Sequence, residues 1–210
     1  MPVLISKRQP IDGPFVAPAS KPETQRAVLF AALADGESVI DSALASRETR
    51  AMSDACQALG AVVEVAGATI RVDGVGAGLR DGRHSGRTTY IWTAGSALVG
   101  RIFSVLGAAI PQRAIIDGNS VLRSRPFTPL FALLERHGVR FDHFDQAHCL
   151  PCSPLTHELP GGRYSLPTSI SSQFATALPA TAPLACRPTT LELTGEHYSL
   201  PYIRTATTGT

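Results

Sequence analysis

The strongest constraint on the fold of this chain is an internal repeat, because one order of predicted helices and strands returns along its 210 residues. In the first unit, helical spacing of apolar residues predicts two helices, over 23–33 and 48–59. Short apolar runs predict three strands, over 38–41, 61–65 and 69–72. A second unit repeats the order with helices at 96–108 and 127–137 and strands at 114–117 and 139–141. The repeat predicts an α/β protein.

Matching positions give the length of the repeat and the extent of each unit. Asp41 matches Asp117 at an offset of 76 residues, Gly60 matches Gly138 at 78, and Pro126 matches Pro201 at 75. The units cover about 18–75, 92–152 and 161–210. At this spacing the third unit needs about 20 to 30 further residues for a second helix and closing strands. Burial of such a helix contributes roughly 6–15 kcal/mol, so we expect either a fragment or completion by another chain.

Composition narrows the classes of protein and partner. Hydrophobic residues make up 44% of the chain, which excludes intrinsic disorder. Nineteen basic and 17 acidic residues leave a net charge of +2, which argues against a nucleic-acid or membrane partner and favours a small molecule. Four cysteines are too few for a disulfide scaffold, and no apolar run approaches a spanning helix of roughly 18 residues. We expect a cytoplasmic protein.

Polar clusters stand at the starts of predicted helices in successive units. Lys21 begins the first helix and Arg26 follows one turn later, a combination that suits an anion such as phosphate. Small residues at 93–97 open the first helix of the second unit, and Arg125 precedes its second helix. The third unit opens on 171–173, Ser-Ser-Gln. Each cluster alone is more typical of a helix cap, but their common placement favours a ligand site.

Eight short motifs follow one another in a specific order. They are Gln9-Pro10-Ile11, Ser20-Lys21 to Arg26, Leu33-Ala34-Asp35-Gly36, Thr49-Arg50-Ala51-Met52, Ala94-Gly95-Ser96-Ala97, Arg125-Pro126, Ser171-Ser172-Gln173-Phe174 and Ser199-Leu200-Pro201-Tyr202-Ile203. In this order they resemble the N-terminal half of the 5-enolpyruvylshikimate-3-phosphate synthases. The resemblance implies an inside-out α/β barrel domain of the enolpyruvyl transferase type, built from βαβαββ repeats, with the third repeat incomplete. Ligands of that family bind between two such domains.

The resemblance also implies an activity and its residues. The family transfers an enolpyruvyl group from phosphoenolpyruvate to shikimate 3-phosphate, a step of the shikimate pathway towards chorismate and the aromatic amino acids. Lys21 would contact both substrates and is the candidate catalytic residue. The residues expected to hold shikimate 3-phosphate are Arg26, Ser171, Ser172, Ser199 and Tyr202, and those expected to face phosphoenolpyruvate are Gly95, Arg125 and Gln173. No cofactor and no metal are expected.

The chain also departs from the family pattern. Pro22 stands where the family usually has serine, and Val99 stands where it has arginine. Arg101 would point about 200° further round the helix and is expected to be a poor substitute. The second domain, with the family's Asp and Glu, lies outside residues 18–210, and residues 1–17 resemble a segment that packs with it. We therefore expect the isolated chain to be inactive without a second domain, which either a partner chain or a missing segment of the gene would supply.

Two alternatives to a transferase stay open. In the first, the chain is a non-catalytic binder of a phosphorylated shikimate-like ligand, which Pro22 and Val99 favour. In the second, it is a transferase-derived enzyme of specialised metabolism that acts on a related cyclitol.

Further polar residues carry simpler interpretations. The loose cluster of His143, His148, Cys149, Cys152 and His157 lacks the second ligand pair of a zinc site, so we interpret it as incidental residues of a hairpin. Glu48 and Asp54 are interpreted as solvated or capping residues of their helix.

Overall fold

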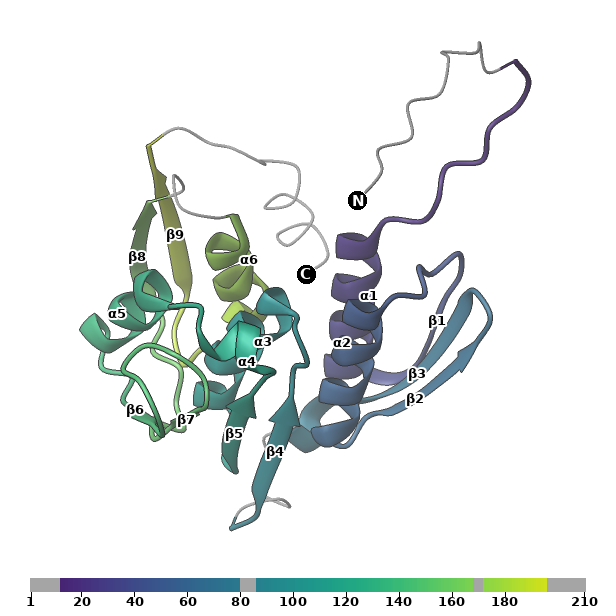
Figure 1. Ribbon diagram of the computed structural model, residues 1–210. Coiled ribbons are helices and arrows are strands. Elements are labelled where there is room, and N and C mark those ends of the chain that lie inside the picture. Colours follow the sequence, from purple (N-terminus) through teal and green to yellow (C-terminus); the bar gives the residue numbers. More distant parts are fainter. Residues whose placement is uncertain (1–11, 80–85, 168–171, 196–210) are drawn as a thin grey trace.

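The computed structural model describes residues 12–79, 86–167 and 172–195 (Figure 1). The first unit forms a three-stranded antiparallel sheet in the order β1-β3-β2. Its elements are α1 (Lys21–Leu33), β1 (Asp35–Ile40), α2 (Arg47–Ala58), β2 (Val62–Ala66) and β3 (Thr69–Val75), followed by a 3-10 turn over Gly76–Leu79. Two sequence signals fix the helix starts. Pro22 stands in the first turn of α1, where its missing N–H is tolerated, and Ser46 with Thr49 forms a capping box at α2.

The second unit forms a four-stranded mixed sheet in the order β4-β5-β7-β6, in which β4 and β5 are parallel. Its elements are β4 (Thr88–Trp92), α3 (Ala97–Leu106), a 3-10 turn (Gly107–Ala109), β5 (Arg113–Asp117), α4 (Ser120–Arg123), α5 (Thr128–Arg136), β6 (Phe141–His143) and β7 (Cys152–Pro154). All ten residues of α3 are buried, which makes it the central helix of the molecule.

The third unit consists, within the described residues, of two parallel strands and the helix between them. These are β8 (Gly162–Pro167), α6 (Ser172–Thr181) and β9 (Thr189–Thr194), with a 3-10 turn at Ala182–Leu184. Pro179 lies inside α6 without ending it. At the last residue of the helix, the Thr181 hydroxyl donates to the carbonyl oxygens of Ala177 and Leu178.

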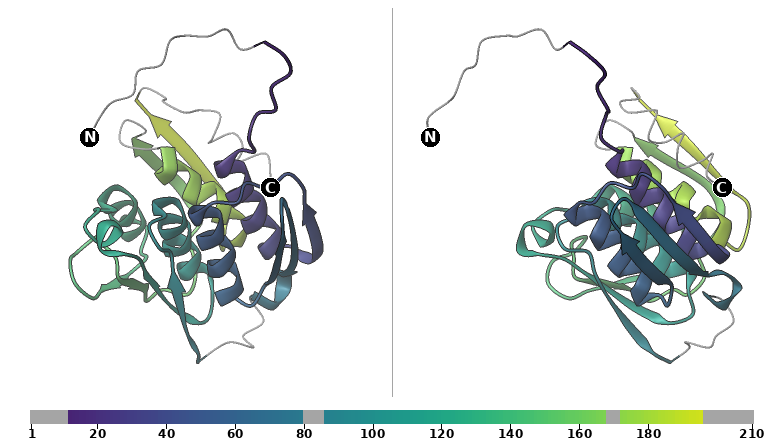
Figure 2. Two further views of the ribbon diagram at one scale, coloured as in Figure 1. Left: turned by 45° about the vertical axis from the view of Figure 1, so that its right-hand side comes forward. Right: turned by 90° about the vertical axis from the view of Figure 1, so that its right-hand side faces the viewer.

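The helices lie inside and the sheets outside. Figure 1 shows the sheets of the first and third units on opposite sides of α1, α2, α3 and α6, and the views of Figure 2 agree. Helix α3 packs on α6, and α1 packs on α2 and β3. The core includes four fully or almost fully buried rings, Phe103, Phe127, Phe131 and Phe174. The predicted α/β class and the inside-out arrangement are confirmed.

Several boundaries differ from the sequence-based expectation. β4 and β8 were not expected, and β6 begins at Phe141 rather than at Val139. Tyr90 and Trp92 of β4 are exposed, so this strand lacks the apolar run that marks a buried strand. The extent of the repeats, the truncation of the third and the separate segment 1–17 stay predictions.

Candidate functional site

A cavity of about 400 Å³ collects residues from all three units. We call it the cationic cavity; its lining residues are Lys21, Pro22, Gln25, Arg26, Glu48, Gly95, Ser96, Ala97, Leu98, Arg125 and Gln173. They come from the start of α1, the start of α2, the loop into α3, the segment between α4 and α5, and the start of α6. Three of these described lining residues are cations and one is a carboxylate, so the wall favours an anionic ligand.

Lys21 is the first residue of α1 and reaches across to α2. Its Nζ lies 3.5 Å from Glu48 Oε1, and both side chains are nearly half exposed. The backbone N–H of Glu48 lowers the pKa of its carboxyl, and the charge of Lys21 lowers it further against the opposing effect of burial. Glu48 is therefore ionised at neutral pH. Its interpretation as only a solvated or capping residue was incomplete, because it also lines the cavity.

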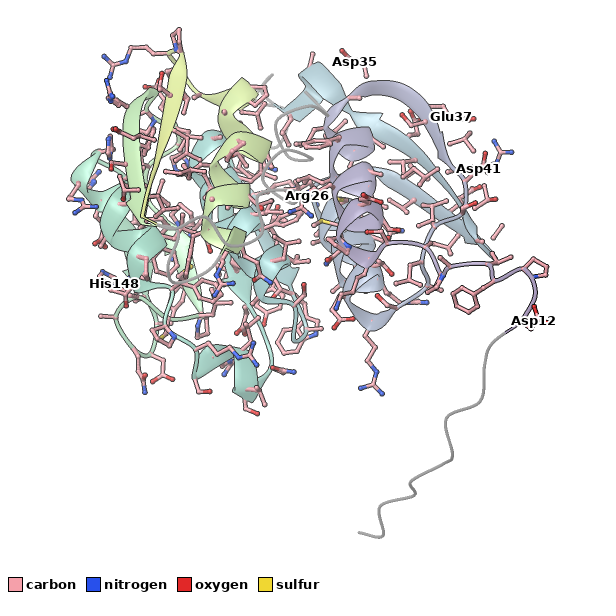
Figure 3. All side chains as sticks on the ribbon, turned by 90° about the horizontal axis from the view of Figure 1, so that it is seen from above. Asp12, Arg26, Asp35, Glu37, Asp41 and His148 are labelled. Atoms are coloured by element: carbon pink, nitrogen blue, oxygen red, sulfur yellow. The ribbon has the colours of Figure 1, made fainter. Side chains whose placement is uncertain are left out.

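Arg26 lies one turn further along α1 and is only 3% exposed. Figure 3 labels it between α1 and the rest of the molecule. Its Nη1 donates to the Pro22 carbonyl oxygen at 2.8 Å, and its Nη2 donates to Thr176 Oγ1 at 2.9 Å. Arg26 thus ties the start of α1 to α6 while it contributes charge to the cavity wall.

The loop into α3 brings small residues to the wall. Ser96 caps α3 by accepting from the Val99 N–H, and its Oγ also accepts from Gln25 Nε2 at 3.3 Å. The same Gln25 nitrogen donates to the Glu48 carbonyl oxygen at 3.0 Å, so one amide joins three segments of the wall. Gly95 has little spare space, since a Cβ there would lie 3.0 Å from Asn119 Nδ2. A glycine at this position therefore leaves room for the Asn119 side chain.

Arg101 was expected to be a poor substitute for the family's arginine, because it would point about 200° further round the helix than Val99. It does not itself line the cationic cavity, but its Nη1 donates to Gln173 Oε1 in the cavity wall. Its guanidinium carbon lies 4.2 Å from the ring centroid of Phe174 and 4.9 Å from that of Phe127. Burial, together with the charge of Arg125, lowers the pKa of Arg101 to about 10. Arg101 therefore stays charged at neutral pH. Sequence spacing missed this placement because α6, which carries Gln173, packs on α3 only in the folded chain.

A network around Asp117 holds the segment that carries Arg125. Asp117 accepts from Arg123 Nε at 2.8 Å, from the Tyr90 hydroxyl at 2.5 Å and from the Gly118 N–H at 2.7 Å. Burial acts to raise the pKa of this carboxyl, but the hydrogen bonds from Arg123, Tyr90 and Gly118 outweigh it and lower the pKa. The network anchors α4 to the end of β5, directly before Arg125.

The structure brings five of the nine predicted site residues together. Lys21, Arg26, Gly95, Arg125 and Gln173 all line the cationic cavity. Ser172 begins α6, and its side chain is not among the parts described. Ser171, Ser199 and Tyr202 lie outside the described residues. The substrate contacts of all nine residues stay predictions.

The histidine and cysteine residues of the second unit have partners of other kinds. His148 Nε2 lies 3.0 Å from Glu135 Oε2, and His143 Nδ1 lies 3.2 Å from the Cys149 carbonyl oxygen. Over residues 12–79, 86–167 and 172–195, no three His, Cys, Asp or Glu side chains gather as metal ligands. Burial raises the pKa of Cys152 to about 12.

Within the same ranges, no helix has the length and apolar character to cross a membrane.

A second cavity, of about 360 Å³, lies between α2 and the strands β2 and β3. Its polar side chains include Thr49 and Ser53, whose hydroxyls donate to the backbone carbonyls of Leu44 and Thr49 respectively. We call it the α2 groove. None of the five predicted site residues whose side chains the structure describes lines this groove.

Comparison with known proteins agrees with the fold and with the motifs. A family model described as EPSP synthase (3-phosphoshikimate 1-carboxyvinyltransferase) matches residues 5–208. The 3-phosphoshikimate 1-carboxyvinyltransferase of Petunia hybrida is 34% identical over 188 residues, which are 87% of this chain and 36% of that protein. The enzyme of the same name from Methanothrix thermoacetophila is 35% identical over 178 residues, which are 85% of this chain and 40% of that protein.

A solved structure of EPSP synthase from Acinetobacter baumannii superimposes with a TM-score of 0.77 at 20% identity, over 91% of this chain and 42% of that one. This likeness shows the fold. The chain spans about two fifths of the length of the curated relatives that it matches. The resemblance carried by the motifs is confirmed: the chain belongs to the EPSP synthase (3-phosphoshikimate 1-carboxyvinyltransferase) family.

Proposed function

We propose that this chain forms one wall of an enolpyruvyl transferase active site and binds shikimate 3-phosphate and phosphoenolpyruvate in the cationic cavity. The observation that carries the proposal is the convergence of Lys21, Arg26, Gly95, Arg125 and Gln173 from three repeat units on one cavity. The reaction would be the transfer of the enolpyruvyl group to shikimate 3-phosphate, in the shikimate pathway of aromatic amino acid biosynthesis.

The charge of the cavity supports this substrate class. Both substrates carry phosphate, and the wall offers Lys21, Arg26 and Arg125 against the single carboxylate of Glu48 among the described lining residues. Cations at fixed positions lower the cost of bringing two anions together and stabilise charge that develops in the transition state. The volume of about 400 Å³ lies in the range of small-molecule sites, roughly 300–1,000 Å³.

The same arrangement leads us to propose that turnover needs a second domain. Among the described lining residues of the cavity, Glu48 is the single carboxylate, and it is paired with Lys21. The family places its Asp and Glu in the second domain, which a partner chain or a longer form of this protein would supply. For this chain we propose a cytoplasmic location.

Phosphate release tests the proposal. We expect no turnover when the chain is mixed with both substrates, and turnover when a second domain from a family member is added. Titration calorimetry with shikimate 3-phosphate should show binding by the chain alone. Absence of binding would overturn the proposal, and turnover by the isolated chain would overturn the need for a second domain. Binding without turnover in the presence of the second domain would favour a non-catalytic binder.

A further inference from the structure

Arg101 is held in one place by its surroundings. It lies in the middle of α3, is 8% exposed, and its guanidinium lies over the rings of Phe127 and Phe174. A guanidinium over aromatic rings gains cation–π attraction and loses rotamer freedom. Because α3 is buried along its whole length, the position of this side chain is set by the core and not by solvent.

This fixed cation determines the orientation of the Gln173 amide. A guanidinium carries only donors, so the Gln173 atom that meets Arg101 Nη1 must be the oxygen Oε1. The amide nitrogen then takes the other side of the group. Gln173 lines the cationic cavity, and an amide in this orientation presents N–H groups to an anion. The flipped amide would present a carbonyl oxygen and would repel the anion.

The charge of Arg101 adds to that of the wall. Among the described residues no carboxylate lies within salt-bridge distance of it, and its Nε is buried without a hydrogen-bond partner. The charge that acts on its pKa is that of another cation, Arg125. A buried cation without a carboxylate raises the free energy of the empty cavity, so an arriving anion offsets part of that free energy.

We infer that Arg101 is a positioning residue that locks the Gln173 amide with its N–H groups towards the anion in the cationic cavity. The inference deepens the proposed function and rests on it for the identity of the ligand. It assigns a role to a residue that does not itself line the cavity.

A double-mutant cycle measures the coupling between Arg101 and Gln173 in ligand binding. The probe is phosphoenolpyruvate, in titration calorimetry of the full chain. We expect Arg101→Met to weaken binding about 10-fold and Gln173→Ala to weaken it by a similar factor. Because Arg101 acts through Gln173, the double variant should bind no more than about 3-fold more weakly than Gln173→Ala alone. Arg101→Lys keeps a charged donor and should recover affinity to within about 3-fold of the unchanged protein.

Arg113→Met is the matched control. Arg113 also lies over a ring, 5.9 Å from the centroid of Phe144, but its side chain is 46% exposed and it does not line the cationic cavity. We expect this variant to bind phosphoenolpyruvate like the unchanged protein. Unchanged affinity in Arg101→Met, or losses that multiply in the double variant, would overturn the inference.

A readout without ligand separates this inference from the proposed function. The side-chain amide resonances of Gln173, identified by their disappearance in Gln173→Ala, should lie away from the values of an exposed glutamine because Arg101 holds the amide oxygen. They should move to those values in Arg101→Met and stay in place in Arg113→Met and Arg101→Lys. Resonances that do not move in Arg101→Met would overturn the lock. If the unchanged protein binds no phosphoenolpyruvate, the proposed function fails, while these resonances still decide the role of Arg101.

Discussion

Replacing Glu48 with glutamine should strengthen anion binding. Glu48 is the only carboxylate among the described residues that line the cationic cavity, and its Oε1 lies 3.5 Å from Lys21 Nζ. Its lowered pKa keeps it ionised at neutral pH. The carboxylate therefore competes with a bound anion for the same lysine. Glu48→Gln removes this competitor and keeps the shape of the side chain.

The magnitude follows from the geometry. An anion oxygen that accepts a charged hydrogen bond of about 2.8 Å from Lys21 Nζ lies no more than about 6.3 Å from Glu48 Oε1, given the 3.5 Å contact. Repulsion at that distance is ~0.7 kcal/mol in bulk water and ~2.6 kcal/mol at an effective dielectric constant of about 20. Both side chains are nearly half exposed, so solvent screening favours the lower part of this range. We expect affinity to rise about 3- to 10-fold.

Titration calorimetry with shikimate 3-phosphate at low salt measures the effect, and Glu37→Gln is its control. Glu37 makes a similar exposed pair with Arg71 at 3.3 Å, and Figure 3 labels it on the opposite side of α1 from Arg26. The control removes the same charge far from the cavity and should leave affinity unchanged. Equal gains in both variants would reduce the effect to net charge, and unchanged or weaker binding in Glu48→Gln would refute the reasoning.

Three further predictions concern binding and stability. Lys21→Ala should weaken binding of shikimate 3-phosphate about 10- to 150-fold, since a hydrogen bond to a charged group contributes ~1.5–3 kcal/mol, while urea unfolding should change by less than about 1 kcal/mol. Gly74→Ala should lower the free energy of unfolding by about 1–3 kcal/mol in the same assay, because its Cβ would lie 2.2 and 2.3 Å from carbonyl oxygens at the end of α1. Burial acts to raise the pKa of Asp117, but hydrogen bonds from Arg123 and Tyr90, among others, outweigh it and lower the pKa below the ordinary value of 3.8. The ionised carboxylate therefore stabilises the fold at pH values above 3.8, and this stabilisation is lost as the pH falls through the lowered pKa. Asp117→Asn should flatten that acid dependence of the urea midpoint.

Much of the fold was predictable because its helices carry strong local signals. The capping box of Ser46 and Thr49 and the buried face of α2 agree with each other, and the repeat gave the order of the elements. β4 was missed because Tyr90 and Trp92 face solvent and its pairing with β5 joins residues 25 positions apart. Such pairing depends on tertiary contacts that local propensity does not contain.

The site was predictable in part, and through resemblance rather than periodicity. Single helix starts at Lys21 and Gly95 do not distinguish a cap from a ligand site, but the ordered motifs selected five residues that the fold brings to one cavity. The angular spacing of residues along a helix predicts the direction in which the Cα–Cβ bond of Arg101 points. It does not predict where the end of this long side chain lies. Its partners on α6 and at Phe127 are set by packing between units.

Backbone amide shifts during a titration with shikimate 3-phosphate test the central claim most directly. The account predicts that the largest changes fall on residues of the cationic cavity, at the starts of α1, α3 and α6 and around Arg125. The α2 groove has a similar volume, about 360 Å³, and serves as the internal comparison. Changes confined to the α2 groove, or scattered over the surface at saturating ligand, would contradict the claim that three repeat units build one anion site.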